Sequence, residues 1–292
     1  MKKDFLSITD LSKEQILKLL DSAAGQKRGA RSEILAGKEV ALIFEKPSLR
    51  TKASFEVGIR ELGGNFSYFS AAECGRLGAR ESVADFAKVL SGYFDAVVAR
   101  VFEHSKLAEL AAAAKIPVVN ALSDFEHPCQ ILADLLTIRE KLGRTEDFKL
   151  AFLGDGNNVA RSLARAAAIL GFEFALAAPE KYQFDPAEKI AQSDNLGAAV
   201  KNADVIYTDA WTSMGDESES AERREIFAPF QLNAEILAAA NPGALALHCL
   251  PAHRGEEITD AVIDGENSGI FEQAANRLPA QKALLTKLFS AE

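Results

Sequence analysis

Short apolar runs alternate along the chain with longer segments in which apolar residues recur at three- and four-residue intervals. The short runs predict buried strands at 40–44, 96–99, 118–119, 149–153, 173–177, 205–208 and 244–248. The longer segments predict helices, of which the clearest span 51–62, 130–142 and 161–170. Such alternation of strands and helices is typical of α/β proteins with mainly parallel sheets.

The polar segment 143–147 separates a long predicted helix from the next predicted strand. We place a domain boundary there and predict two doubly wound parallel-sheet domains, 1–145 and 146–292. Sheets of this kind bind ligands at the carboxyl ends of their strands. We therefore expect the two domains to face a central cleft, where small-molecule sites are common. Residues 277–292 predict an amphipathic C-terminal helix that packs back on the first domain.

Composition narrows the classes of function. The 292 residues carry a formal net charge of −9, which argues against nucleic acid as a partner because phosphate backbones need a basic surface. No apolar run approaches the roughly eighteen residues that span a bilayer, and the N-terminal residues lack the apolar core of a signal peptide. The 3 Cys form no disulfide framework and indicate a reducing, cytoplasmic setting. Their spacing matches no zinc site, so we predict no metal.

A turn between a predicted strand and a predicted helix carries Ser48, Leu49, Arg50 and Thr51. The two hydroxyls lie beside helix N-terminal N–H groups, and the Arg50 guanidinium is planar, a combination that suits a phosphate. The turn is not a P-loop, because it lacks a glycine-rich stretch that ends in Gly-Lys-Ser/Thr. Taken alone, these residues favour ordinary N-capping by Ser48 next to a surface arginine.

His127 to Gln130 open the predicted helix that ends near Leu142. A neutral histidine N–H can donate to a carbonyl oxygen, and the oxygen of a glutamine side chain can accept from an NH2 group. Because the two residues are three apart, both can face one cleft. A helix-capping histidine and a solvated glutamine explain the pattern equally well.

The loop Gly154 to Val159 follows a predicted strand and is rich in glycine and asparagine. A dinucleotide-binding fingerprint is disfavoured because the third glycine is missing. The loop can instead present Asn157 or Asn158 to a ligand.

Two further strand ends carry polar residues. Asp209 can bind an ammonium group, and Ser213 with nearby N–H groups can bind a carboxylate, which together suit an α-amino acid. A plain loop around a buried Trp211 is the alternative. Cys249 follows another strand and is either a reactive thiol or a small buried residue.

The set of motifs resembles that of the aspartate/ornithine transcarbamylase family. Ser48 to Thr51 is similar to its phosphate-binding Ser-Thr-Arg-Thr, and His127 to Gln130 to its His-Pro-x-Gln. Asp209 to Gly215 and His248 to Pro251 resemble the Asp-x-x-x-Ser-Met-Gly and His-Cys-Leu-Pro motifs that mark the ornithine branch. The resemblance runs in order over essentially the whole chain and includes Ala275 to Arg277 near its end.

The resemblance implies transfer of the carbamoyl group from carbamoyl phosphate to the δ-amino group of L-ornithine, giving L-citrulline and phosphate. It implies no cofactor and no metal, and an assembly that is a homotrimer or a multiple of one. Arginine biosynthesis is the implied setting, with the biosynthetic or degradative direction left open.

The family's roles carry over to matching positions. The residues that would bind carbamoyl phosphate are Ser48, Leu49, Arg50, Thr51, Arg100, His127, Gln130, Leu250, Arg277 and, from a neighbouring subunit, Arg76. The residues that would bind ornithine are Asn158, Asp209, Ser213 and Met214. Arg100, His127 and Cys249 would be catalytic: His127 would polarise the carbamoyl carbonyl, and Cys249 with the Leu250 carbonyl would lie by the attacking nitrogen.

Three departures from the family pattern stand out. Leu49 replaces a threonine, Arg76 stands where relatives often have Gln or His, and the segment 180–203 is shorter than in most relatives. Within the same chemistry, the alternative is a transcarbamylase for a modified ornithine or a diamine. From other classes, the alternatives are an NAD-dependent Rossmann dehydrogenase and a non-catalytic binding homologue.

Overall fold

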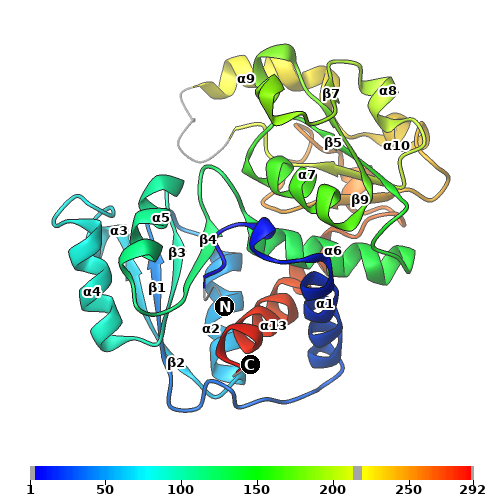
Figure 1. Cartoon of the computed structure of the whole chain (residues 1–292). Coiled ribbons are helices and arrows are strands. Elements are labelled where there is room, and N and C mark those ends of the chain that lie inside the picture. The colour runs from blue at the N-terminus through cyan, green and yellow to red at the C-terminus, as the bar shows by residue number, and fades with distance from the viewer. Residues whose placement is uncertain (1–3, 213–218, 291–292) are drawn as a thin grey trace. The chain divides into compact units, whose positions relative to one another are not determined.

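The computed structural model describes residues 4–212 and 219–290, apart from the side chain of Cys74. These residues form two compact units (Figure 1). Unit 1 comprises residues up to Leu136 together with the C-terminal segment from Asn276, and unit 2 comprises Thr137–Ala275. Each unit is an α/β layer structure around its own sheet. In the part of the chain described, no helix is long and apolar enough to cross a membrane.

Unit 1 is built on a four-stranded parallel sheet in the order β2-β1-β3-β4. The strands are β1 Glu39–Phe44, β2 Asn65–Ser70, β3 Ala96–Arg100 and β4 Val118–Leu122. Residues 40–44 of β1 and all of β3 are buried, because these strands lie inside the sheet and are covered on both faces. Their continuous apolar runs are the pattern expected of covered parallel strands.

The helices of unit 1 lie on both sides of this sheet. They are α1 Lys13–Lys27, α2 Leu49–Glu61, α3 Ala71–Cys74, α4 Val83–Tyr93, α5 His104–Ala113, the first part of α6 Pro128–Leu142, and α13 Arg277–Phe289. A short 3-10 helix at Ile8–Asp10 precedes α1. The C-terminal helix α13 packs against α1 and α2. An ion pair of 2.7 Å between Lys282 Nζ and Glu61 Oε2 links it to α2. The chain therefore returns to the first unit at its end, as the sequence led us to expect.

Unit 2 contains a five-stranded parallel sheet in the order β7-β6-β5-β8-β9. Its strands are β5 Lys149–Leu153, β6 Glu173–Ala177, β7 Gln192–Ser193, β8 Val205–Thr208 and β9 Leu245–His248. Its α-helices are α7 Asn158–Leu170, α8 Leu196–Val200, α9 Ser220–Phe227, α10 Ala234–Ala238, α11 Asp260–Ile263 and α12 Ile270–Ala275. Short 3-10 helices lie at Glu180–Tyr182, Pro186–Glu188 and Ala228–Phe230. The α/β class with two parallel sheets is thus confirmed.

The segment 180–203 contains a short strand and a short helix. The strand β7 has 2 residues and the helix α8 has 5. Gln192 Oε1 accepts from the Phe184 backbone N–H at 2.7 Å, and Gln192 Nε2 donates to the Phe184 carbonyl oxygen at 2.9 Å, which holds the segment at the sheet edge.

Candidate active site

The candidate residues of unit 1 gather at the carboxyl ends of β1, β3 and β4. These strands are neighbours in one parallel sheet, so the segments that follow them emerge at the same edge. The turn at Ser48 follows β1, Arg100 ends β3, and the turn before His127 follows β4. The sequence therefore brings together at this edge residues that lie nearly eighty positions apart.

Ser48 caps the N-terminus of α2. Its Oγ accepts from the Thr51 backbone N–H at 3.3 Å and donates to Thr51 Oγ1 at 3.1 Å. The Ser48 side chain engages only the Thr51 N–H, and a helix N-terminus carries further N–H groups that an anion can bind, so the cap does not exclude an anion site. The Leu49 side chain is 79% exposed, so the change from threonine leaves the backbone N–H at this turn in place.

His127 is buried, and so is Arg100. The register between β3 and β4 shifts between Ala99 and Arg100, an irregularity that re-aims a side chain at the end of a strand. Burial lowers the pKa of His127 well below its ordinary value, and the positive charges of Arg277 and Arg100 lower it further. The imidazole is therefore neutral at physiological pH and can donate one N–H to an oxygen.

Arg277 joins the end of the chain to this site. Its guanidinium donates from Nη1 to Gln130 Oε1 and from Nη2 to Thr51 Oγ1, the latter at 3.1 Å. Arg277 is the first residue of α13 and is buried. The packing of α13 on α2 thus places a buried cation beside the start of α2, where an anion is favoured.

Arg76, predicted to act from a neighbouring subunit, is exposed and lies against its own chain. Its guanidinium stacks 4.0 Å from the centroid of the Phe102 ring, and Lys46 Nζ lies 4.3 Å from the same centroid. The buried Glu45 carboxylate accepts from the backbone N–H of Leu77 at 2.6 Å and of Phe102 at 2.7 Å. These bonds fix the loop that carries Arg76, and its role across a subunit boundary stays a prediction.

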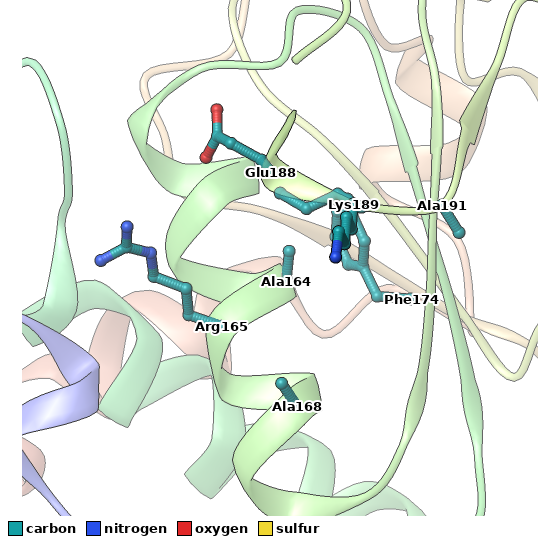
Figure 2. A pocket seen from close by; sticks show the side chains of 8 residues that line it. Ala164, Arg165, Ala168, Phe174, Glu188, Lys189 and Ala191 are labelled. Carbon is teal, nitrogen blue, oxygen red and sulfur yellow. The ribbon is translucent and has the colours of Figure 1, made fainter. Parts of the chain in front are cut away.

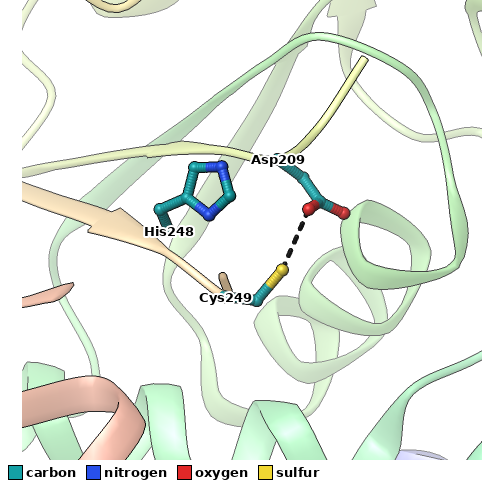
Figure 3. Close-up of side chains that lie close together, drawn as sticks. All are labelled: Asp209, His248 and Cys249. Carbon is teal, nitrogen blue, oxygen red and sulfur yellow. Dashed lines mark hydrogen bonds between the residues drawn. The ribbon is translucent and has the colours of Figure 1, made fainter. Parts of the chain in front are cut away.

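In unit 2, Asp209 and Cys249 follow the neighbouring strands β8 and β9 and meet directly. Cys249 Sγ donates to Asp209 Oδ1 at 3.0 Å, as the dashed line in Figure 3 shows. The other Asp209 oxygen accepts from Asn157 Nδ2 at 2.8 Å. The parallel pairing of β8 with β9 brings the two strand ends together.

The two asparagines of the glycine-containing loop have different surroundings. Asn157 caps α7, with its Oδ1 accepting from the N–H groups of Val159 and Ala160 at 3.0 Å, and it also holds Asp209. Asn158, the predicted ligand-binding residue, is the first residue of α7. The structure thus assigns Asn157 to positioning Asp209. Of the other predicted ornithine-binding residues, Ser213 and Met214 lie outside the described residues.

The turn after β9 depends on a buried carboxylate that sequence reasoning missed. His248 Nδ1 accepts from the Leu250 backbone N–H at 2.8 Å, so its Nε2 carries the proton that it donates to Glu257 Oε1 at 3.0 Å. Leu250 has a φ of 58° and is joined to Pro251 by a cis peptide bond. Burial raises the pKa of Glu257, but hydrogen bonds from His248 and from the His253 backbone outweigh it and lower the pKa overall.

Potential metal ligands gather in two groups of unit 2. Among the described residues, Asp209, His248 and Cys249 bring ligand atoms within 4.8 Å of one another, and so do His253, Glu256 and Glu257. Both ring nitrogens of His248 already make hydrogen bonds, so the imidazole has no free lone pair to offer. Only two ligands remain in the group that contains His248, fewer than a protein zinc site uses.

The loop after β8 is anchored by Arg223 of α9, another residue that the sequence gave no reason to select. Its Nη1 donates to Asp155 Oδ2 at 2.7 Å and to the Trp211 carbonyl oxygen at 2.8 Å. Trp211 is buried against Tyr182 and Phe227. This guanidinium joins the loop after β5 to the loop after β8.

The Gly154 loop is closed to a dinucleotide by the chain itself. The Gly156 N–H donates to the Tyr182 carbonyl oxygen at 2.8 Å, and a Cβ built at Gly156 would lie 2.9 Å from that oxygen. The glycine therefore permits close packing of residues 180–184 over the turn. A pyrophosphate would need the same N–H groups, which disfavours the dehydrogenase alternative.

A separate hollow of about 320 Å³ lies beside α7 (Figure 2). Its walls are Ala164, Arg165, Ala168, Phe174, Glu188, Lys189, Ile190 and Ala191. The segment 180–203 forms one side, and none of the predicted site residues lines the hollow. It is therefore not the site that the motifs indicate.

Comparison with known proteins agrees with the geometry in both units. Residues 3–140 match the family model of the aspartate/ornithine carbamoyltransferase carbamoyl-P binding domain, and residues 146–288 match that of the Asp/Orn binding domain. The chain is 48% identical to the ornithine carbamoyltransferase of Methanosarcina mazei, with 99% of each chain covered. It is 50% identical to that of Anoxybacillus flavithermus, with 98% of this chain and 96% of that one covered.

The solved structure of the Pyrococcus furiosus ornithine carbamoyltransferase superposes with a TM-score of 0.92 at 47% identity, covering 98% of this chain and 96% of that chain. The matches extend over both units and are in the order of the motifs. The chain belongs to the aspartate/ornithine carbamoyltransferase family.

Proposed function

We propose that this enzyme transfers the carbamoyl group of carbamoyl phosphate to the δ-amino group of L-ornithine, with L-citrulline and phosphate as products. The observation that carries the proposal is the buried imidazole of His127, kept neutral by burial and by the charges of Arg277 and Arg100. A neutral N–H donor flanked by fixed cations suits a carbonyl on a dianionic ligand.

The phosphate of carbamoyl phosphate would be held at the start of α2. The ligands there are the hydroxyls of Ser48 and Thr51, the backbone at Leu49, and the guanidinium groups of Arg50 and Arg277. Arg277 is buried and has lost much of its hydration, so a dianion gains more from it than it would from a surface lysine. This local cluster of positive charges can bind an anion although the whole protein carries a net charge of −9.

The acceptor amine would be bound in unit 2. Asp209 and Asn158, with Ser213 and the backbone of Met214, would hold the α-amino and α-carboxylate groups of ornithine. Cys249 and the Leu250 carbonyl would lie by the δ-nitrogen. The direct contact between Cys249 and Asp209 at 3.0 Å supports the grouping of these two residues.

The reaction then needs positioning and charge stabilisation. The lone pair of the neutral δ-amine forms the new N–C bond, and the carbonyl oxygen becomes an oxyanion that His127, Arg100 and Thr51 stabilise. The C–O bond to phosphate breaks, and the proton lost by nitrogen leaves with the phosphate. Binding both reactants in one orientation lowers the entropic part of the barrier.

The test is an assay of citrulline from carbamoyl phosphate with ornithine, acetylornithine, succinylornithine or putrescine as acceptor. We expect turnover with ornithine and at least a hundredfold lower kcat/KM with the others, since a modified or missing group leaves buried polar partners without a match. Absence of citrulline would overturn the proposal, and preference for another acceptor would favour the modified-ornithine alternative.

The roles of the two domains, the cellular setting and the assembly follow from the same proposal. We assign residues 1–145 to carbamoyl phosphate and 146–292 to ornithine, with the C-terminal helix serving the first site. We further propose a cytoplasmic enzyme of arginine biosynthesis that assembles as a homotrimer or a multiple of one, which light scattering tests directly. The low cysteine count supports the reducing compartment.

A further inference from the structure

A buried carboxylate lies directly behind the candidate site of unit 1. Asp134 is fully buried on α6, one helical turn after Gln130 and on the same face. The Gln130 side chain is also buried, and its Nε2 donates to Asp134 Oδ1 at 2.8 Å. Charged carboxylates are rarely placed in a protein interior without a specific partner, so this contact calls for an explanation.

The contact fixes which end of the Gln130 amide faces the site. A carboxylate oxygen only accepts, and a guanidinium only donates. The Gln130 NH2 must therefore point at Asp134, and its Oε1 must point at Arg277, from which it accepts. Turning the amide by 180° would put oxygen against carboxylate and NH2 against guanidinium, which are two repulsive contacts.

The two restraints on Gln130 are not equivalent once a ligand is bound. Arg277 has donors that a phosphate dianion attracts, so its hold on Oε1 weakens when such a ligand enters. Asp134 lies on the same rigid helix as Gln130 and offers nothing to an anion. It is the partner that keeps Oε1 aimed at the ligand, where a second lone pair can accept from an NH2 group.

We propose that Asp134 is a positioning residue that orients the Gln130 amide, and that the site thereby selects a ligand with an NH2 donor over one with a methyl group. The inference rests on the proposed function and deepens it. It explains how the site could reject acetyl phosphate, which matches carbamoyl phosphate in shape and charge but has CH3 in place of NH2.

The test uses two stable phosphonates, phosphonoacetamide and acetonylphosphonate, which differ only in NH2 against CH3. Calorimetric titration gives their affinity ratio for the intact wild-type protein and for Asp134→Leu and Asp134→Ala. Asp134→Asn is the matched control, because its side chain keeps an acceptor oxygen for the Gln130 NH2. Binding of inorganic phosphate by each variant reports whether the anion site is intact.

We expect the wild type to prefer the amide by roughly tenfold or more, the gain from one hydrogen bond in a buried site. Asp134→Leu and Asp134→Ala should bring the ratio close to one by weakening the amide alone, and Asp134→Asn should restore most of it. Equal weakening of both ligands would indicate a structural role and overturn the inference.

An unchanged ratio in either variant, or no preference in the wild type, would overturn it as well. The wild-type measurement stands even if a substituted protein fails to fold. Failure of the proposed function is separate, because it would appear as a lack of citrulline in the wild-type assay.

Discussion

Replacing His127 by glutamine should change how the stability of the protein depends on pH. Burial, and then the charges of Arg277 and Arg100, hold the pKa of His127 well below the ordinary 6.5 in the folded state. In the unfolded chain His127 titrates near 6.5. Below that pH His127 binds a proton in the unfolded state but not in the folded state, so acid favours unfolding.

The size follows from linkage. Between pH 7.5 and pH 5.5, a group with an unfolded pKa of 6.5 that stays neutral in the folded state costs about 1.4 kcal/mol of unfolding free energy. The His127→Gln variant lacks this group but keeps every other titrating residue. Between pH 7.5 and pH 5.5, the wild type should therefore lose unfolding free energy relative to the variant, by at most about 1.4 kcal/mol.

The assay is urea unfolding at both pH values without ligands, with circular dichroism as the signal that monitors the transition. The single tryptophan, Trp211, lies in unit 2, so its fluorescence follows that unit separately. The pH-dependent difference should appear in the transition of unit 1. A difference that does not change with pH would refute the depressed pKa, and with it the neutral donor that the proposed mechanism needs.

Three further expectations follow. Arg277→Met should weaken phosphate binding roughly tenfold to a hundredfold, since it removes a buried charged donor; titration calorimetry measures this, and unchanged affinity would remove Arg277 from the site. Arg223→Leu should cost about 3 kcal/mol of unfolding free energy, because it removes the guanidinium of a 2.7 Å ion pair with Asp155 and its hydrogen bond to the Trp211 carbonyl oxygen. A loss below about 1 kcal/mol in urea unfolding would contradict the anchoring role. Burial raises the pKa of Cys129 to about 12, so iodoacetamide at pH 8 should spare it and alkylate the half-buried Cys249, as peptide mass spectrometry can show.

The parts of the fold that the sequence predicted are those with a strong local pattern. All seven predicted strands are present, because continuous apolar runs are typical of strands covered on both faces. The strand β2, Asn65–Ser70, was not predicted, since it lies at the sheet edge with half-exposed aromatic and polar residues. The two-residue β7 is too short to leave a pattern.

The candidate site divides in the same way. Residues at the ends of neighbouring parallel strands, such as Asp209 and Cys249, can be grouped from the sequence because the topology fixes where strand ends lie. Asp134 could have been found from its four-residue spacing after Gln130. Glu257 and Arg223 could not, because each reaches its partner through loop and helix packing that no local pattern encodes.

The choice between Asn157 and Asn158 shows why neighbouring candidates need coordinates. Both are asparagines in the loop that follows Gly156, and sequence chemistry does not separate them. Asn157 has an extended backbone at the helix N-cap, so its side chain turns back to the α7 N–H groups and reaches Asp209. Asn158 is already inside the helix and points elsewhere by one hundred degrees of helical rotation, about the angle between successive residues. A single residue of register thus decides which of the two amides positions the Asp209 carboxylate.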